Sequence, residues 1–369
     1  MTGGGRDVVG AAGLATSAAR AAAVDAFVDA AFTGFEQAFC HPGNGMEDHV
    51  VLAGRPVRLR FAGPTLRERF LPAVRHLLGP GTGPPTLTVC CWDGTSAPAP
   101  AGFPDPPWPK DDFLRDGRIR GHIAGPIVAT YAADERLFQL YDRTRRRALF
   151  YVGDGRGLPS WHDRSPFRLF LGLWADDHGL AVLHGATVAE NGTAVVLAGP
   201  SGAGKSTSAM ACTLAGMGFL GDDACLAEVG GGAATARVHS VYGHAKLEAD
   251  ASDWLGGRET LLRVGPVRHD DDHSTVVSPA RLTTAAALGA VLLVSIGGRP
   301  GSELSDPLPP EAALEPLMDT VREESRGLTP VACAALRIVV ESVPVRRLVA
   351  GTDRAQLVDA VRAAARPQP

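Results

Sequence analysis

One glycine-rich segment constrains this chain more than any other feature: residues 199–206 read GPSGAGKS, which fits the spacing G-x-x-x-x-G-K-[ST]. Before it, the β-branched and apolar run Thr193–Ala198 predicts a buried strand, and after it residues 206–214 favour a helix. A glycine-rich turn from a strand into a helix offers backbone N–H groups and the positive end of the helix dipole to an anion. The segment therefore predicts a loop that binds the phosphates of a nucleoside triphosphate, which we expect to be ATP.

The motif gives each polar residue of the loop an expected task. Lys205 would contact the β- and γ-phosphates, and the Ser206 hydroxyl would occupy one position around a Mg²⁺ ion. Lysine is scarce in this chain, where it occurs as Lys110, Lys205 and Lys246, so its place in the motif is hard to attribute to chance. The alternative is a glycine-rich turn that binds nothing. The residues expected to line the nucleotide are Gly199, Ser201, Gly202, Ala203, Gly204, Lys205, Ser206 and Thr207.

Composition and charge argue against several other kinds of partner. Apolar residues make up 45% and charged residues 21% of the 369 positions, which is typical of a soluble globular chain. The formal net charge of −4 offers no general attraction for nucleic acid or anionic lipid, so we expect neither as a partner. No long apolar run occurs, and charged residues interrupt the Ala-rich start, so we expect no membrane span and no secretion signal. Six cysteines without C-x-x-C spacing indicate reduced thiols, and the protein is expected to be cytoplasmic.

Two domains are expected from the length and from a polar join with Gly and Pro at residues 155–164. Residues 1–160 would form a mixed α+β N-terminal domain, whose role in recognising a partner or substrate stays open because it contains no chemical motif. Periodicity predicts its helices at 16–39 and 66–78, and its strands at 55–61, 86–92, 122–131, 137–141 and 148–152.

Residues 165–366 would form the second domain, of the α/β class, which contains the glycine-rich loop. Ser165 as an N-cap and Pro166 in the first turn predict a helix over 167–177, and Gly179 is a suitable residue to end it. Further strands are expected at 236–242 and 290–296, and further helices at 310–325 and 352–365.

Two adjacent carboxylates, Asp222 and Asp223, follow the apolar segment Gly218-Phe219-Leu220 one helix after the loop. At the carboxyl end of a strand in this position they would lie beside the phosphates. One carboxylate could hold Mg²⁺, and the other could accept a proton from an attacking hydroxyl. Repulsion between the two charges would raise one of the two pKa values, which favours a base. A solvated turn with an Asp cap is the alternative.

A hairpin signal brings a histidine toward the loop. The dipeptide Asn191-Gly192 separates the apolar runs 180–188 and 193–199 and is typical of a two-residue hairpin turn. That turn fixes the pairing of the two runs and puts His184 opposite Gly199. The imidazole could there reach a γ-phosphate oxygen or the acceptor, whereas the alternative is a hydrogen-bonded histidine of the core.

Several other classes of phosphate-binding protein are recognised by a second motif, and those second motifs are not found in this chain. A GTPase would carry N-K-x-D, but the three lysines follow Pro109, Gly204 and Ala245. The L-S-G-G-Q motif of transport ATPases is absent, and we find no convincing apolar strand that ends in Asp-Glu as in oligomeric motors. Lys246 has two interpretations: it could neutralise phosphate charge, or it could be a surface lysine.

Taken together, these motifs resemble the HPr serine kinase/phosphorylase family, whose catalytic domain is a P-loop module akin to phosphoenolpyruvate carboxykinase. The family pattern is H-G-x-x-V, a short turn, an apolar strand, G-x-S-G-x-G-K-S, a helix ending at Gly, an apolar pair and D-D. This chain has His184-Gly185-Ala186-Thr187-Val188, the loop at 199–206, Gly218-Phe219-Leu220 and Asp222-Asp223, over about forty residues. The family's second glycine-rich signature is not found, so the chain looks closer to divergent relatives, including kinases of natural-product precursor peptides.

The resemblance implies a Mg²⁺–ATP-dependent kinase that transfers the γ-phosphoryl group to a Ser-type hydroxyl of a protein or peptide. On this basis Asp222 looks like the catalytic base, and Asp223 like a metal-side carboxylate next to the metal ligand Ser206. His184 looks like the phosphate-site histidine, and Lys205 like the nucleotide ligand and catalytic lysine.

Two other functions stay open at this level. The chain could be an ATP-binding regulatory module without phosphotransfer, in which residues 1–160 contact a partner. It could also be a small-molecule kinase whose N-terminal half covers the site. Neither the acceptor nor the oligomeric state follows from the sequence, and a homo-oligomer is among the alternatives.

Overall fold

The computed structural model describes residues 8–100, 102–229, 236–270, 274–324 and 329–366. The described residues form a mixed α/β protein with three β-sheets, in agreement with the expected class. By its internal contacts the chain divides into two compact units, Met1–Asp48 with Arg58–Arg69 and Thr86–Leu158, and His49–Val57 with Phe70–Pro85 and Pro159–Pro369. None of the described helices combines the length and apolar content that crossing a bilayer requires.

A six-stranded sheet occupies the N-terminal half of the chain, with the strand order β1-β2-β3-β6-β5-β4. Side chains of its strands share one core with α1, including Phe27 and Phe35 of the helix and Trp92, Phe138 and Leu149 of the sheet. The elements here are α1 (Val8–Cys40), β1 (Gly45–Leu52), β2 (Arg55–Ala62), α2 (Pro64–Val74), η1 (Arg75–Leu77), β3 (Leu87–Asp93), η2 (Lys110–Asp112), β4 (Ile127–Ala132), β5 (Leu137–Asp142), β6 (Arg147–Val152) and η3 (Gly155–Gly157).

Most expected elements of this half are present, and two differences have a physical reason. The strand expected at 122–131 begins only at Ile127, because the residues before it form turns. The strand β1 was missed, because its first five residues include Glu47, Asp48 and His49 and leave no apolar alternation to read.

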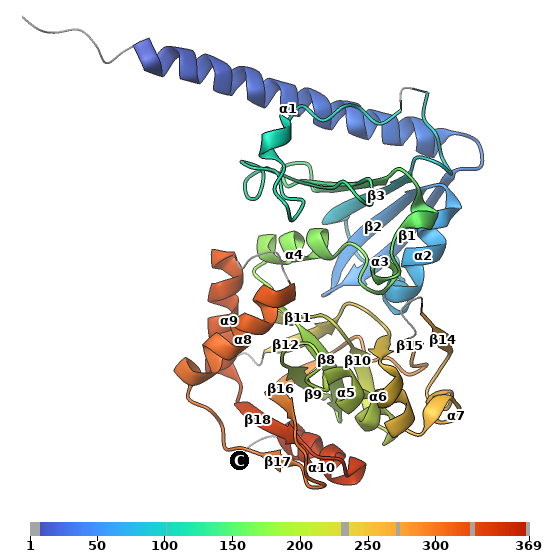
Figure 1. Ribbon diagram of the computed structural model, residues 1–369, viewed down its shortest axis with the longest axis vertical. Coiled ribbons are helices and arrows are strands. Elements are labelled where there is room, and N and C mark those ends of the chain that lie inside the picture. The colour runs from blue at the N-terminus through green and yellow to red at the C-terminus, as the bar shows by residue number, and fades with distance from the viewer. Residues whose placement is uncertain (1–7, 101, 230–235, 271–273, 325–328, 367–369) are drawn as a thin grey trace, which may run out of the picture. The chain divides into compact units, whose positions relative to one another are not determined.

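A nine-stranded sheet organises the second unit, with the order β10-β8-β9-β16-β12-β11-β7 and with β18 beside β16 (Figure 1). Its centre is parallel, since β16 pairs in parallel with both β9 and β18. Its strands are β7 (Ala181–Leu183), β8 (Gly185–Glu190), β9 (Thr193–Ala198), β10 (Gly218–Gly221), β11 (Cys225–Glu228), β12 (Arg237–Ser240), β16 (Ala285–Ile296), β17 (Glu303–Leu304) and β18 (Val345–Ala350).

Helices and a small antiparallel sheet complete this unit. The small sheet has the order β13-β15-β14. The remaining elements are α3 (Trp161–Arg164), α4 (Arg168–Asp177), α5 (Lys205–Leu214), β13 (Ala245–Leu247), α6 (Ala249–Trp254), α7 (Gly257–Leu261), β14 (Val267–His269), β15 (Thr275–Val277), α8 (Pro310–Glu324), α9 (Pro330–Ser342) and α10 (Arg354–Ala365).

Strand β9 is apolar at every position after its first residue because helices cover both faces of the sheet. Val195 and Leu197 share a core with residues of α5 and α10. Ala194, Val196 and Ala198 point the other way and share a core with residues of α8 and α9. A strand buried on both faces reads as a continuous apolar run, which is why the sequence identified β9 correctly to the residue.

The hairpin before the glycine-rich loop has the register expected from its turn. Asn191 and Gly192 adopt φ angles of 51° and 82°, and β8 pairs with β9 antiparallel down to Gly185 opposite Ala198. The expected single strand over 180–188 is wrong, however. It divides at His184, because β7 leaves the hairpin and pairs with β11 instead.

The start of the helix expected at 167 is also wrong. Phe167 has a left-handed φ of 62°, and α4 begins at Arg168. Tertiary contacts hold the preceding residues out of the helix: the Phe167 ring packs on Phe70 at 5.4 Å, and the Tyr242 hydroxyl donates to the Pro166 carbonyl at 2.9 Å. The helix ends as expected, with Asp177 last and Gly179 at φ 67°.

Toward the C-terminus the expected helices at 310–325 and 352–365 correspond to α8 and α10. The elements α9 and β18 between them were missed. The signal was present, since Thr329 caps α9 through a 3.0 Å bond from the amide of Ala332, and Pro330 follows it in the first turn.

The hairpin turn can be tested with two matched glycines of the second unit. A Cβ added to Gly192, or to Gly172 within α4, would meet no other atom within 4 Å. Because Gly192 is left-handed, Gly192→Ala is expected to lower the free energy of unfolding by about 1 kcal/mol. In the helix, Gly172→Ala is expected to raise it by up to about 1 kcal/mol. Urea unfolding followed by circular dichroism measures both, and equal effects would contradict the left-handed turn.

Candidate functional site

A cavity of about 790 Å³ opens in the second unit where the carboxyl ends of β9, β16 and β18 meet. Its volume suits a small-molecule ligand, and carboxyl ends of parallel strands are the usual place for one. Every residue expected from the sequence to act in catalysis or to bind the metal lines this cavity, namely His184, Lys205, Ser206, Asp222 and Asp223.

The glycine-rich loop connects β9 to α5 at one wall of the cavity. Gly199, Gly202 and Gly204 have φ angles of 155°, 78° and 91°, which explains why glycine stands at each of these positions. A Cβ on Gly199 would also approach the Val294 carbonyl oxygen of β16 to 2.8 Å. Lys205, the first residue of α5, folds back and donates from Nζ to the carbonyl oxygens of Gly199 and Pro200 at 2.8 and 2.9 Å.

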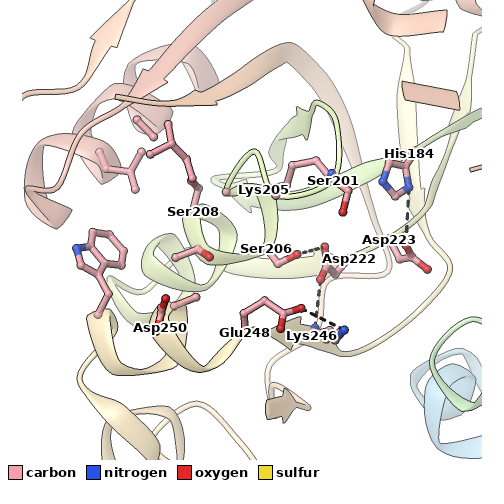
Figure 2. A pocket seen from close by; sticks show the side chains of 18 of the residues that line it. His184, Ser201, Lys205, Ser206, Ser208, Asp222, Asp223, Lys246, Glu248 and Asp250 are labelled. Carbon is pink, nitrogen blue, oxygen red and sulfur yellow. Dashed lines mark hydrogen bonds and ion pairs between the residues drawn. The ribbon is translucent and has the colours of Figure 1, made fainter. Parts of the chain in front are cut away.

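Asp222 lies directly beside the start of α5. The Ser206 hydroxyl donates to its Oδ1 at 3.0 Å, and the backbone amide of Lys246 donates to its Oδ2 at 3.3 Å (Figure 2). Asp222 is only 5% exposed. Burial raises the pKa of Asp222 to about 6, and the neighbouring charge of Asp223 acts in the same direction, against the two hydrogen bonds.

Asp223 has the opposite electrostatic character, although it is the next residue. Its backbone is left-handed, with φ 71°, so the two carboxylates point in different directions. The Ser165 hydroxyl donates to it, and His184 Nδ1 lies 3.7 Å from its Oδ1. Burial tends to raise the pKa of Asp223, but Arg168, His184 and Ser165 together outweigh it and hold the pKa below its usual value. Neighbouring carboxylates with pKa values moved apart are a common arrangement for an acid–base pair.

His184 lies where β7 ends and β8 begins. The β8–β9 pairing extends to the residue next to it, because Gly185 pairs with Ala198. The His184 side chain is buried in the cavity wall, with Nδ1 3.7 Å from Asp223 Oδ1. The structure thus brings His184 to the carboxylate pair, as well as to the cavity that the glycine-rich loop lines (Figure 2).

Several residues of the site carried no clear signal in the sequence. Ser165 and Arg168 act on Asp223 from the turn before α4 and from its first residue. His244 is buried in the cavity wall, and burial lowers its pKa to about 4, helped by Arg268. The scarcity of lysine did point to Lys246, whose backbone contacts Asp222 while its ammonium pairs with Glu248 at 3.1 Å.

A divalent cation could be held here, although not by protein side chains alone. Among the described residues, no group of three or more His, Cys, Asp or Glu side chains is arranged to hold a metal ion. The Ser206 hydroxyl nevertheless offers a hard oxygen ligand at the start of α5, and the carboxylates of Asp222 and Asp223 line the same cavity. Mg²⁺ commonly takes one or two such ligands and completes its shell with phosphates and water. The residues present therefore fit Mg²⁺ in company with a bound phosphate chain.

Comparisons with known proteins give a remote structural likeness and no sequence match. No protein-family model matches the chain, and no curated protein matches it. A search of solved structures finds similarity to the Hpr(Ser) kinase/phosphatase from Coxiella burnetii. The two are 10% identical, the match covers 49% of this chain and 88% of that one, and the TM-score is 0.25. A likeness this remote says nothing about activity.

Burial of His244 has a consequence for stability that can be measured. The pKa lies near 4 in the folded protein and at 6.5 for an ordinary histidine, so the unfolded chain binds more protons between these values. The neutral His244 ring therefore makes its full contribution to the free energy of unfolding above pH 6.5, and this contribution is lost as the pH falls toward 4. His244→Gln is expected to remove a pH dependence of about 2–3 kcal/mol over this range.

Urea unfolding midpoints at several pH values, without added metal, measure this dependence. The matched control is His41→Gln, at an exposed position, which should leave the profile of the wild type unchanged. If His244→Gln and wild type lost stability in parallel between pH 6.5 and 4, burial of the neutral ring would be the wrong explanation.

Proposed function

We propose that this protein is a Mg²⁺–ATP-dependent phosphotransferase that moves the γ-phosphoryl group to a hydroxyl of a protein or peptide acceptor. The observation that carries the proposal is the contact between Ser206 and Asp222, which joins the glycine-rich loop to the carboxylate pair in one cavity. A loop that can bind phosphates and a buried carboxylate beside it are the two parts that phosphoryl transfer needs.

The phosphate chain would lie along the loop and the first turn of α5. Backbone N–H groups and the helix dipole attract the phosphates, and Lys205 exchanges its loop carbonyl partners for phosphate oxygens. Mg²⁺, when bound, would offset the negative charge of the phosphates. Ser206 would hold the metal, with Asp223 as the metal-side carboxylate because its lowered pKa keeps it ionised.

Asp222 is the proposed proton acceptor. Its pKa of about 6 lies close to neutral pH, where an effective general base is ionised and still takes up a proton readily. The hydrogen bonds from Ser206 and the Lys246 amide fix its orientation next to the phosphate end of the loop. His184 would contact the transferred phosphoryl group or the acceptor from the side of Asp223.

Two substitutions separate binding from transfer. Asp222→Asn keeps the size of the side chain and is expected to reduce transfer by about 100-fold or more, while ATP affinity stays within a few-fold. Lys205→Met is expected to weaken ATP binding itself by at least about tenfold, because it removes the cation from the phosphate chain. Asp253→Asn, at an exposed position on α6, is the control and should resemble the wild type.

The measurement uses [γ-³²P]ATP with Mg²⁺ and an extract of the source organism, together with calorimetric titration of ATP. Labelling of an acceptor by the wild type and its loss with Asp222→Asn support the proposal. Tight ATP binding with no labelled acceptor would contradict it and favour the regulatory module instead. A variant Asp223→Asn tests the division of roles. Weaker Mg²⁺ binding in this variant is expected if Asp223 is the metal-side carboxylate, whereas a slower transfer rate with unchanged Mg²⁺ affinity would instead identify Asp223 as the base.

A further inference from the structure

We propose that the apolar end of the same cavity holds the base of the nucleotide, with the Trp254 indole as its stacking surface. The inference rests on the proposed function and adds to it the place of the nucleoside and the class of base accepted. Trp254, Ile296 and Leu357 form this end, and none of the expected site residues lies among them.

The two ends of the cavity differ in chemistry. One end contains Asp222, Asp223 and His184. Toward the other end lie an indole, two aliphatic side chains, the small residues that follow β16 and β18, and the Asp250 carboxylate. Figure 2 shows Asp250, from the helix that carries Trp254, on the opposite side of Ser206 from Asp223 and His184. If the terminal phosphate lies near Asp222 and Asp223, the nucleoside extends from the glycine-rich loop toward the apolar end.

Ile296 is an exposed aliphatic residue at the end of a central strand. It is the last residue of β16 and is 68% exposed, although the strand that ends there is the centre of the sheet. A Cβ on Gly204 would lie 3.4 Å from Ile296 Cγ1, so the isoleucine stands next to the last glycine of the loop. A base placed over it would bury apolar surface at the position that the phosphates dictate.

Trp254 is held in place before any ligand arrives. Its Nε1 donates to the Thr352 carbonyl at 3.2 Å, and the Arg354 guanidinium lies over the ring, 5.9 Å from its centroid. Arg354 is itself fixed by a 2.8 Å bond to the Leu255 carbonyl. A pre-oriented aromatic ring loses little conformational freedom on stacking with a base.

We expect the protein to recognise the base mainly by stacking on its face, and less by hydrogen bonds to its edge. The described residues of the cavity include no Asn or Gln, and nearby amides are occupied: Gly297 N donates to Ala350 O at 2.8 Å, and Gly351 N donates to Ser302 Oγ at 2.9 Å. Every base has a face that can stack, so stacking alone discriminates weakly between adenine and guanine. We therefore expect ATP and GTP to bind with affinities within a few-fold of each other.

Calorimetric titration of the full chain with MgATP, MgGTP and magnesium tripolyphosphate tests the proposal. The wild type is expected to bind both nucleotides at least about tenfold more tightly than tripolyphosphate, which has no base. Trp254→Ala should lose about tenfold for both nucleotides and leave tripolyphosphate unchanged. Trp254→Phe, which keeps an aromatic face, should recover most of the loss.

The control is Leu262→Ala, because Leu262 is an exposed apolar residue of the same unit that does not line the cavity. It should leave nucleotide affinity unchanged. Unaltered ATP affinity in Trp254→Ala, or an equal loss for ATP and tripolyphosphate, would overturn the stacking role. A clear preference for one purine over the other would overturn the expected tolerance, whereas a wild type that binds neither ATP nor tripolyphosphate would contradict the proposed function itself.

Discussion

Hydrogen bonding between the three parallel strands β9, β16 and β18 is the constraint on which the site depends. Parallel strands end at the same edge of a sheet, so the segments that follow them must meet there. The glycine-rich loop, Ile296 and the residues after Ala350 become neighbours for this reason alone. Helices on both faces bury the strands and make that edge the open end of the core.

The carboxylate pair shows how the fold gives adjacent, identical side chains different properties. A left-handed residue at Asp223 turns its side chain toward Ser165 and His184, while Asp222 stays with Ser206. Burial, more than repulsion between the two charges, raises the pKa of Asp222, and positive neighbours lower that of Asp223. One carboxylate therefore gains protons readily near neutral pH and the other stays ionised. This difference underlies the separate tasks proposed for them.

Local sequence was a good guide wherever a short-range rule decides the structure. The dipeptide Asn191-Gly192 determined the register of its hairpin, and the apolar run before the loop gave the bounds of β9. Local rules failed where a distant segment competes. Ser165 does not N-cap α4, which begins at Arg168, and its hydroxyl donates instead to Asp223, 58 residues away. The strand expected over 180–188 breaks at His184, because β11 offers a better partner to its first half.

The sequence by itself determined the strand, loop and helix around residues 199–206, the turn that leads His184 toward them, and the presence of two carboxylates one helix later. These follow from spacing, glycine content and apolar runs, which act over a few residues. Only the tertiary structure decided which carboxylate meets Ser206, which cations act on Asp223, and that Trp254 and Ile296 line the same cavity as the glycine-rich loop. Those contacts join segments far apart in the chain, and no local pattern encodes them because packing of the sheet and its helices brings them together.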